Sequence, residues 1–156
     1  MFFIFGVLNG YIQNDANIIE ELNTYLEKQD LTNEQTERYK KIIIEEYSTL
    51  KYEIKKETID NDTALVETEI TVKDLYGASK KAEKNLLDNP MDFYIDGNYS
   101  KELFINHKLD IMESSNELAT YTINFELEKK DGKWKLKKLD DETLEKIHGI
   151  YNYEQT

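Results

Sequence analysis

The last third of the chain alternates large apolar and charged side chains on both sides of an Asp-Gly pair. Between residues 125 and 136 the sequence reads FELEKKDGKWKL. Strict alternation predicts strands with one buried and one exposed face, and Asp-Gly favours a two-residue type I′ turn between them. Opposite charges on the two strands agree with the register that this turn sets. We therefore predict a hairpin with these facing pairs: Leu127 and Leu136, Lys129 and Trp134, Glu128 and Lys135, Glu126 and Lys137.

A second pattern of period two occupies residues 50–73 and is interrupted by IDND at residues 59–62. Apolar residues alternate with Lys and Glu on both sides of the interruption. The two apolar sets share a face only if the loop between them has an odd number of residues. We therefore predict a three-residue loop, Asp60 to Asp62, that sets these residues opposite each other: Leu50 and Val72, Tyr52 and Ile70, Lys55 and Glu67.

Apolar residues at helical spacing predict three helices before the first hairpin. Thr32 and Gln35 have the spacing of a capping box, which predicts the start of the third helix. Asp15 or Asn17 can cap the second helix. The inward-facing residues of the three helices are expected to be Ile4, Leu8, Tyr11 and Ile12; Ile18, Ile19, Leu22 and Leu26; and Tyr39, Ile42, Ile43 and Tyr47.

Helical spacing returns between the hairpins and at the end of the chain. A helix over residues 77–89 must stop before Pro90, because proline disfavours helical geometry at the residue before it. We expect a glycine-containing loop at residues 94–98, a helix from Ser100, and a final helix capped by Asp140. The helix from Ser100 is expected to bury two flanks, Phe104, His107 and Ile111 on one and Ile105, Leu109 and Met112 on the other, and the final helix to carry Leu144 and Ile147.

The order of elements is helices, hairpin, helices, long hairpin and short helix. Because no strand–helix–strand alternation appears, the pattern predicts an α+β fold with an antiparallel sheet. The length of 156 residues, with no linker or internal repeat, predicts a single domain over residues 1–156.

The net charge and the cysteine content limit the functions that are compatible with this sequence. The chain carries 32 acidic and 20 basic residues, a net charge of −12, which argues against binding to nucleic acids or anionic membranes. A basic protein partner suits this charge, although solubility alone also explains it. Cysteine is absent, which excludes disulfides, thiolate metal sites and cysteine nucleophiles.

No apolar run approaches the roughly 18 residues that a membrane span needs. The opening MFFIFGVL lacks the basic segment and the cleavage site of a signal peptide.

Two segments resemble the nuclear-transport-factor-2-like (cystatin-like α+β) superfamily. FGVLNGYIQNDANIIEEL resembles its first helix, polar break and second helix, and TYTINFELEKKDGKWKLKKLDDETLEKI resembles its long strand, turn and return strand. The overlapping stretch YTINFELEKKDGKWKLKKLDDETLEKIHGIYN also resembles small uncharacterised lipoproteins of low-GC Gram-positive bacteria with this fold. The chain departs from those lipoproteins in lacking a signal peptide and a lipid-bearing cysteine.

The resemblance implies a cone, in which a curved antiparallel sheet of about four strands wraps over the N-terminal helices. Such cones usually hold a cavity between sheet and helices. Members use it for catalysis or for small ligands, or dimerise through the sheet.

Few residues are candidates for catalysis or for metal binding. His107 lies on a helix among apolar residues and could act as a base or a ligand, but a packed helix histidine explains it more simply. His148, near the end of the last helix, is expected to be a cation that favours the helix carboxyl end. Acidic pairs are explained as caps and solvated faces, and the Asp-rich loops lack the spacing of a calcium site. We therefore predict neither a metal nor a cofactor.

The strand aromatics Tyr52, Tyr121, Phe125 and Trp134 are expected to be core residues or, with His107, the wall of a ligand site. We favour a non-enzymatic domain that binds a small apolar ligand or a basic protein partner and is related to bacterial cell-surface lipoproteins. The alternatives are an acidic, immunity-type interaction module and a small isomerase or dehydratase. A homodimer through the sheet is compatible with all three. We expect lipid anchoring at the cell surface if an upstream signal precedes this chain, and a cytoplasmic location otherwise.

Overall fold

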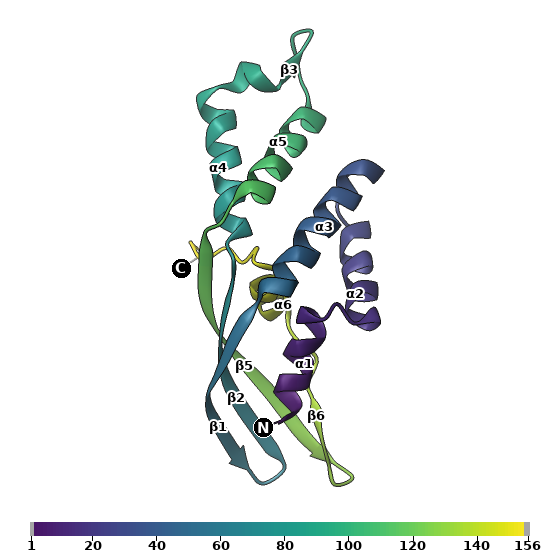
Figure 1. Cartoon of the computed structure of the whole chain (residues 1–156), viewed down its shortest axis with the longest axis vertical. Coiled ribbons are helices and arrows are strands. Elements are labelled where there is room, and N and C mark those ends of the chain that lie inside the picture. The colour runs from purple at the N-terminus through teal and green to yellow at the C-terminus, as the bar shows by residue number, and fades with distance from the viewer. Residues whose placement is uncertain (1, 155–156) are drawn as a thin grey trace.

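A computed structural model describes residues 2–154, and side chains from residue 6 onward. Within this part, six α-helices and a four-stranded antiparallel sheet confirm the α+β class (Figure 1). In chain order the elements are α1 (Phe2–Ile12), α2 (Ala16–Glu27), α3 (Asn33–Thr49), β1 (Lys51–Asp60), β2 (Thr63–Lys73), α4 (Leu75–Asp88), the 3-10 helix η1 (Pro90–Phe93), β3 (Tyr94–Ile95), β4 (Asn98–Tyr99), α5 (Lys101–Ser114), β5 (Leu118–Lys130), β6 (Lys133–Leu136) and α6 (Asp141–His148). The single domain over residues 1–156 stays a prediction.

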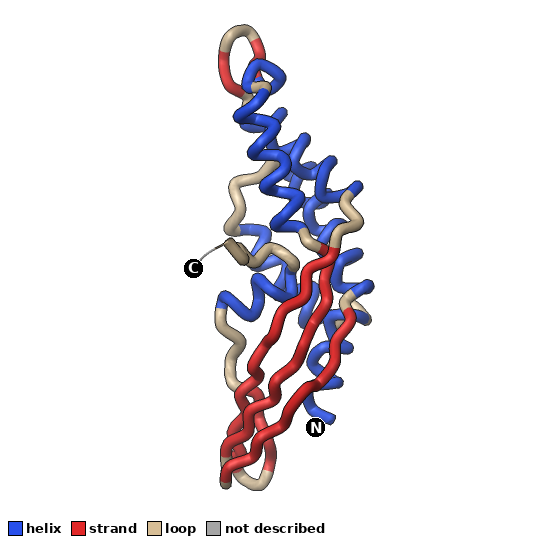
Figure 2. Tube along the Cα trace, turned by 90° about the vertical axis from the view of Figure 1, so that its left-hand side faces the viewer, coloured by secondary structure: helices blue, strands red, loops and turns tan. Residues whose placement is uncertain are grey.

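The large sheet has the strand order β1-β2-β5-β6, and every neighbouring pair is antiparallel. In Figure 2, helices lie behind the strands, beside them and beyond their upper ends. Side chains alternate between the two faces of a strand, so the buried face of β2 and β5 collects the apolar residues Ala64, Val66, Ile70, Val72, Tyr121, Ile123, Phe125 and Leu127. The other face carries mainly Thr, Glu and Asn.

The hairpin of β5 and β6 forms as predicted. Leu127 pairs with Leu136, Glu128 with Lys135, and Lys129 with Trp134. Asp131 and Gly132 have φ values of 51° and 77°, as a type I′ turn requires. Lys137 lies beyond the strand, donates its amide to the Glu126 carbonyl at 2.8 Å, and forms an ion pair with that side chain at 3.9 Å.

The hairpin of β1 and β2 differs from the prediction in its loop. Tyr52 faces Ile70 as expected, but Lys56, not Lys55, faces Glu67. Asp60 pairs with Thr63, so the turn contains only residues 61 and 62, and a β-bulge lies between Ile54 and Lys56. A bulge adds one residue to one strand, so a two-residue turn plus a bulge has the same parity as a three-residue loop. Leu50 lies outside the strand, at the C-terminal end of α3.

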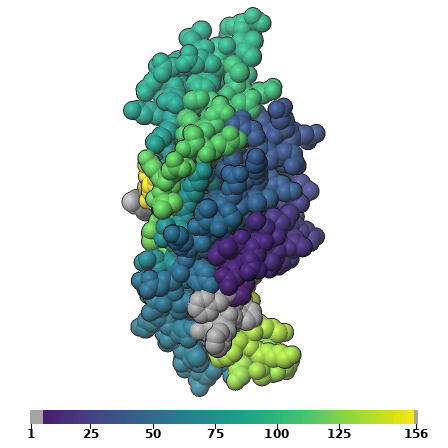
Figure 3. All heavy atoms as spheres, in the orientation of Figure 1, coloured from purple at the N-terminus to yellow at the C-terminus, as the bar shows by residue number. Residues whose placement is uncertain are grey.

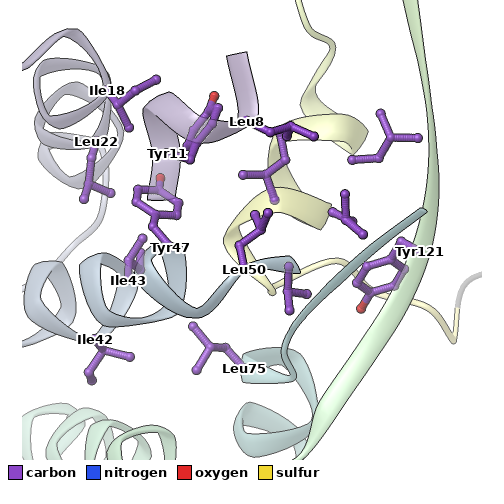
Figure 4. Packing of buried hydrophobic residues seen from close by; sticks show 14 of the residues in the cluster. Leu8, Tyr11, Ile18, Leu22, Ile42, Ile43, Tyr47, Leu50, Leu75 and Tyr121 are labelled. Atoms are coloured by element: carbon purple, nitrogen blue, oxygen red, sulfur yellow. The ribbon is translucent and has the colours of Figure 1, made fainter. Parts of the chain in front are cut away.

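The N-terminal helices pack their predicted apolar residues inward. Thr32 and Gln35 form the capping box of α3, and Asp15 occupies the N-cap position of α2 without a side-chain capping bond. The predicted residue Ile4 lies outside the described side chains. Figure 4 shows the core between α1, α2, α3 and the sheet; its buried helix residues include Leu8, Tyr11, Ile18, Leu22, Leu26, Tyr39, Ile42, Ile43 and Tyr47.

The segment between the two hairpins projects at one end of the molecule (Figure 1). The helix α4 ends at Asp88, and Ser100 caps α5 by accepting the amide of Leu103 at 3.3 Å. The predicted loop at residues 94–98 is instead a small hairpin, in which Tyr94 faces Tyr99. Asp96 and Gly97, with φ values of 51° and 82°, form the same kind of turn as Asp131 and Gly132.

The helix α6 begins at the predicted cap, since Asp140 accepts the amide of Thr143 at 2.8 Å. It ends at Gly149, whose left-handed φ of 75° terminates the helix. Ile147 and His148 are buried and Leu144 is half-buried. None of the described helices combines the length and the apolar character that a membrane span requires.

Candidate functional site

A large, mainly apolar cavity lies between α1, α2 and the segment that leads from β6 into α6. Its volume is about 710 Å³, within the range of about 300–1,000 Å³ that small-molecule sites occupy. The residues that line it come from α1, α2, α3, β6, α6 and the loops beside them: Gly6, Val7, Gly10, Tyr11, Asp15, Asn17, Ile18, Glu21, Thr24, Tyr25, Tyr47, Leu136, Lys137, Lys138, Leu139, Asp141, Leu144, Glu145 and His148.

Three tyrosines and one histidine form a continuous aromatic wall of this cavity. The ring of Tyr47 lies 5.2 Å from that of Tyr11 and 5.6 Å from that of His148. The ring of Tyr25 also packs against His148, with centroids 5.2 Å apart. Figure 4 shows Tyr11 on α1 and Tyr47 on α3 close to one another. The wall therefore depends on the packing of α1, α2, α3 and α6.

All four rings are uncharged near neutral pH, and burial opposes charging of each of them. Loss of solvation lowers the pKa of His148 from 6.5 to about 4. The expectation of a histidine cation at the end of α6 is therefore wrong, because the imidazole is buried against Tyr25 and Tyr47. Burial also raises the pKa of the phenols Tyr11, Tyr25 and Tyr47.

Carboxylates outnumber cations around the aromatic wall. Asp15 and Glu21 approach from α2 and its cap, and Asp141 and Glu145 from α6, whereas the only lysines in the lining are Lys137 and Lys138. Burial raises the pKa of Glu145, and the neighbouring charges of Asp141 and Glu142 add to this effect. Aromatic faces and carboxylates both attract cations, and the rings also accept apolar surface. The cavity is therefore suited to a small ligand with an apolar body and a positive charge.

The strand residues predicted as a ligand wall lie elsewhere. Tyr121 and Phe125 lie on the same inner face of β5 and are buried in the core. The half-buried Tyr52 donates its hydroxyl to Asn9 Oδ1 at 3.1 Å. Trp134 is half-buried on β6, with Lys129 Nζ 5.9 Å from its ring centre. None of these four lines the large cavity, and their binding role stays a prediction.

His107 lies in the projecting segment, away from the other predicted residues. Its Nε2 is 2.9 Å from Asn85 Nδ2, and its ring packs 5.1 Å from that of Phe93. It lines a separate, more polar cavity of about 480 Å³ with Asn85, Asn89, Asp92, Phe93, Leu103, Asn106 and Asp110. No group of three or more His, Asp or Glu side chains suitable for a metal occurs among the described residues.

Sequence reasoning missed the aromatic wall. Tyr11 and Tyr47 were expected to be core residues of separate helices, and His148 a surface cation. The only available signal was the recurrence of tyrosine on the apolar sides of successive helices, because tyrosine combines an apolar body with a polar tip. Nothing in the sequence showed that α6 returns to α1 and α2.

No protein-family model and no curated protein matches the chain. Among solved structures, the chain is similar to that of a "putative lipoprotein (ycdA)" from Bacillus subtilis subsp. subtilis str. 168. The TM-score is 0.47 and the sequence identity 18%, over 85% of this chain and 44% of that chain. The chain thus spans less than half of that protein. This likeness carries no argument about activity, and it does not confirm the nuclear-transport-factor-2-like superfamily.

Proposed function

We propose that this domain is a non-enzymatic binding protein that holds a small organic cation with an apolar body in the cavity between α1, α2 and α6. The observation that carries the proposal is the wall of Tyr11, Tyr25, Tyr47 and His148 beside the carboxylates of Glu21 and Glu145. The uncharged rings accept the apolar body, and the carboxylates supply the charge preference.

The sign of the ligand charge follows from the protonation states in the wall. The low pKa of His148, about 4, removes the cation that would otherwise attract an anion. Lys137 and Lys138 lie on the segment between β6 and α6, and Lys137 is already close to the carboxylate of Glu126. A cationic ligand therefore meets less repulsion than an anionic one.

The buried histidine also gives a second candidate, an isomerase or dehydratase, some support. Such an enzyme needs a base in an enclosed cavity, and His148 is an uncharged imidazole in such a position. Proton transfer near neutral pH is most efficient when the pKa of the base is also near neutral. A pKa of about 4 makes this imidazole a weak base, so we favour binding.

For the fold we retain the proposal of a nuclear-transport-factor-2-like cone related to Gram-positive lipoproteins. Its support is the order of elements and the two segments named above, with an antiparallel sheet on one side of the N-terminal helices. The proposed cavity differs in position from the centre of such a cone, because the inner face of β2 and β5 is filled by its own side chains.

A titration with two probes of similar shape and opposite charge tests the proposal. We expect 4-phenylbutylamine to shift the amide signals of the cavity lining in an NMR titration of the full chain, and 4-phenylbutyrate to bind at least about fivefold more weakly, since about 1 kcal/mol corresponds to that ratio. Equal affinity for the two probes, or shifts confined to other regions, would contradict the proposal.

Matched variants locate the binding. Glu21→Gln removes a carboxylate from the lining, whereas Glu20→Gln removes an exposed neighbour on the same helix. Leu139→Trp fills the cavity, whereas Leu118→Trp places the same ring on an exposed position of β5. We expect the first member of each pair to weaken binding of the amine and the second to leave it unchanged. Equal effects within either pair would place the site elsewhere.

A further inference from the structure

The projecting end of the molecule concentrates exposed apolar side chains. We call this region the tip and define it as residues 87–103, which include the end of α4, η1, the hairpin of β3 and β4, and the start of α5. Six of the ten large apolar residues that are exposed among the described residues fall in this short stretch. They are Leu87, Met91, Tyr94, Ile95, Tyr99 and Leu103.

The small hairpin presents apolar groups on both of its faces. Tyr94 and Tyr99 face each other across the strands and pack edge to face, with centroids 6.2 Å apart. Ile95 is the next residue along the strand, so its side chain points to the opposite face. Single exposed apolar residues need no explanation, but a cluster of them is typical of an interaction site. Aromatic residues and methionine are also enriched at such sites.

The backbone of the tip is held in place by the residues beneath it. Phe93 is buried and packs edge to face against Phe104, with centroids 5.7 Å apart. Its carbonyl accepts the amide of Ser100 at 2.7 Å, directly beside the hairpin. Figure 3 shows this end of the molecule extending beyond the N-terminal helices. The exposed side chains are therefore presented by a preorganised support, which lowers the entropy lost on binding.

The charges at the tip identify the kind of partner. Asp88, Asp92, Asp96 and Glu102 are exposed, and none of them forms an ion pair within the described part of the chain. The single basic residue of the tip, Lys101, is already paired with Asp30. A second copy of the tip would bring like charges together. A partner with an apolar surface bordered by lysine or arginine satisfies both features.

We propose that the tip is a docking surface for a basic protein partner, and that its apolar side chains insert between cationic groups of that partner. The site is separate from the cavity between α1, α2 and α6, so this proposal is independent of the proposed ligand. The unpaired carboxylates steer the partner toward the tip, and the apolar residues hold it there.

A synthetic amphipathic helix of 18 residues built from leucine and lysine serves as a probe, with a leucine–glutamate helix as its counterpart. In an NMR titration of the full chain, we expect the lysine helix to shift the signals of residues 87–103 and the glutamate helix to leave them unchanged. Binding of the lysine helix should weaken as salt screens the carboxylates. Shifts centred elsewhere, or equal binding of the two helices, would overturn the proposal.

Two matched comparisons separate the tip from general attraction to an acidic surface. Ile95→Ser should weaken binding of the lysine helix about tenfold, because burial of an isoleucine side chain contributes free energy of that order. Ile59→Ser changes an isoleucine of similar exposure on β1, 58% against 53% for Ile95, and should have no effect. Replacing Asp88, Asp92 and Asp96 by Asn should reduce the salt dependence, whereas Glu34→Gln, Glu37→Gln and Glu45→Gln on α3 should not. Equal effects of tip and control variants, or self-association that Ile95→Ser abolishes, would contradict the inference.

Discussion

The tip and the junction of α3, α6 and β2 depart from the usual distribution of side chains in opposite ways. At the junction, Glu46 and His148 are buried, and both carboxylate oxygens of Glu46 lack a hydrogen-bond partner within the described structure. At the tip, apolar side chains such as Ile95 are exposed. A buried ionisable group opposes folding, whereas an exposed apolar group leaves the folded state largely unaffected. Variants at the junction should therefore change stability, and variants at the tip should change binding.

The largest expected change in the free energy of unfolding is at Gly149. We compare it with Gly97, because the two glycines have similar backbone geometry. Gly149 at the junction and Gly97 at the tip have φ values of 75° and 82°. A Cβ atom at Gly149 would overlap the carbonyl oxygen of Lys73, whereas one at Gly97 would meet open space. We expect Gly149→Ala to lower the free energy of unfolding by about 3–5 kcal/mol, and Gly97→Ala by about 1 kcal/mol. Urea unfolding measures both, and losses of equal size would show that the junction is not tightly packed.

Acidification should lower the free energy of unfolding, because the buried His148 does not take up a proton as readily as the unfolded histidine does. The unfolded histidine binds a proton below its pKa of 6.5 and the folded one only below about 4, so stability falls as the pH falls through this interval. The loss reaches about 3 kcal/mol at pH 4. His148→Phe keeps a ring beside Tyr25 and Tyr47 but cannot bind a proton. We expect its unfolding free energy to lack this loss, and a decline as steep as in the wild type would contradict the burial of a neutral imidazole.

Glu46 should have the opposite pH dependence. Burial raises the pKa of this carboxyl well above 4.5, although the charge of Lys73 opposes the change. Above pH 4.5 the unfolded state releases the proton and the folded state retains it, so stability falls as the pH rises. Glu46→Gln should raise the free energy of unfolding at pH 7 by about 1–2 kcal/mol, and should have little effect at pH 4. The control is Glu45→Gln, at the adjacent exposed residue. An equal rise in its free energy of unfolding would show that burial of Glu46 is not the cause.

The smallest stability effect is expected at the tip. Leu87→Ser and Ile95→Ser alter exposed side chains, so each should change the free energy of unfolding by less than about 0.5 kcal/mol. The same Ile95 variant is expected to weaken binding of the lysine helix. A large loss of stability of either variant in urea unfolding would show that the tip contributes to the stability of the fold, as the junction does.

The two long hairpins show how much of the strand register the local sequence specifies. Asp131-Gly132, the alternating apolar residues and the cross-strand charges all specify one register, and the structure has it. In the other hairpin, the sequence sets only the parity, which a bulge between Ile54 and Lys56 satisfies as well as a longer loop does. The hairpin of β3 and β4 carried the same Asp-Gly signal at residues 96 and 97, but its strands are too short to show alternation.

The candidate cavity could not be predicted in the same way. Its aromatic wall combines Tyr11, Tyr25 and Tyr47 with His148, which is more than a hundred residues further along the chain. Each residue fits an ordinary local role as a core tyrosine or a helix-end histidine. Only the tertiary structure brings them together into one aromatic wall, whereas the predicted strand residues Tyr121 and Phe125 are buried in the core.

The sequence alone determined the α+β class, the helix caps at Thr32 and Asp140, and the register of β5 and β6. These features depend on capping bonds, turn geometry and side-chain periodicity, which act between residues close along the chain. Tertiary structure alone decided the bulge in β1, the cavity, the neutral state of His148 and the exposure of the tip. Each of these depends on which surfaces exclude water when distant segments pack, and that exclusion is a property of the assembled fold.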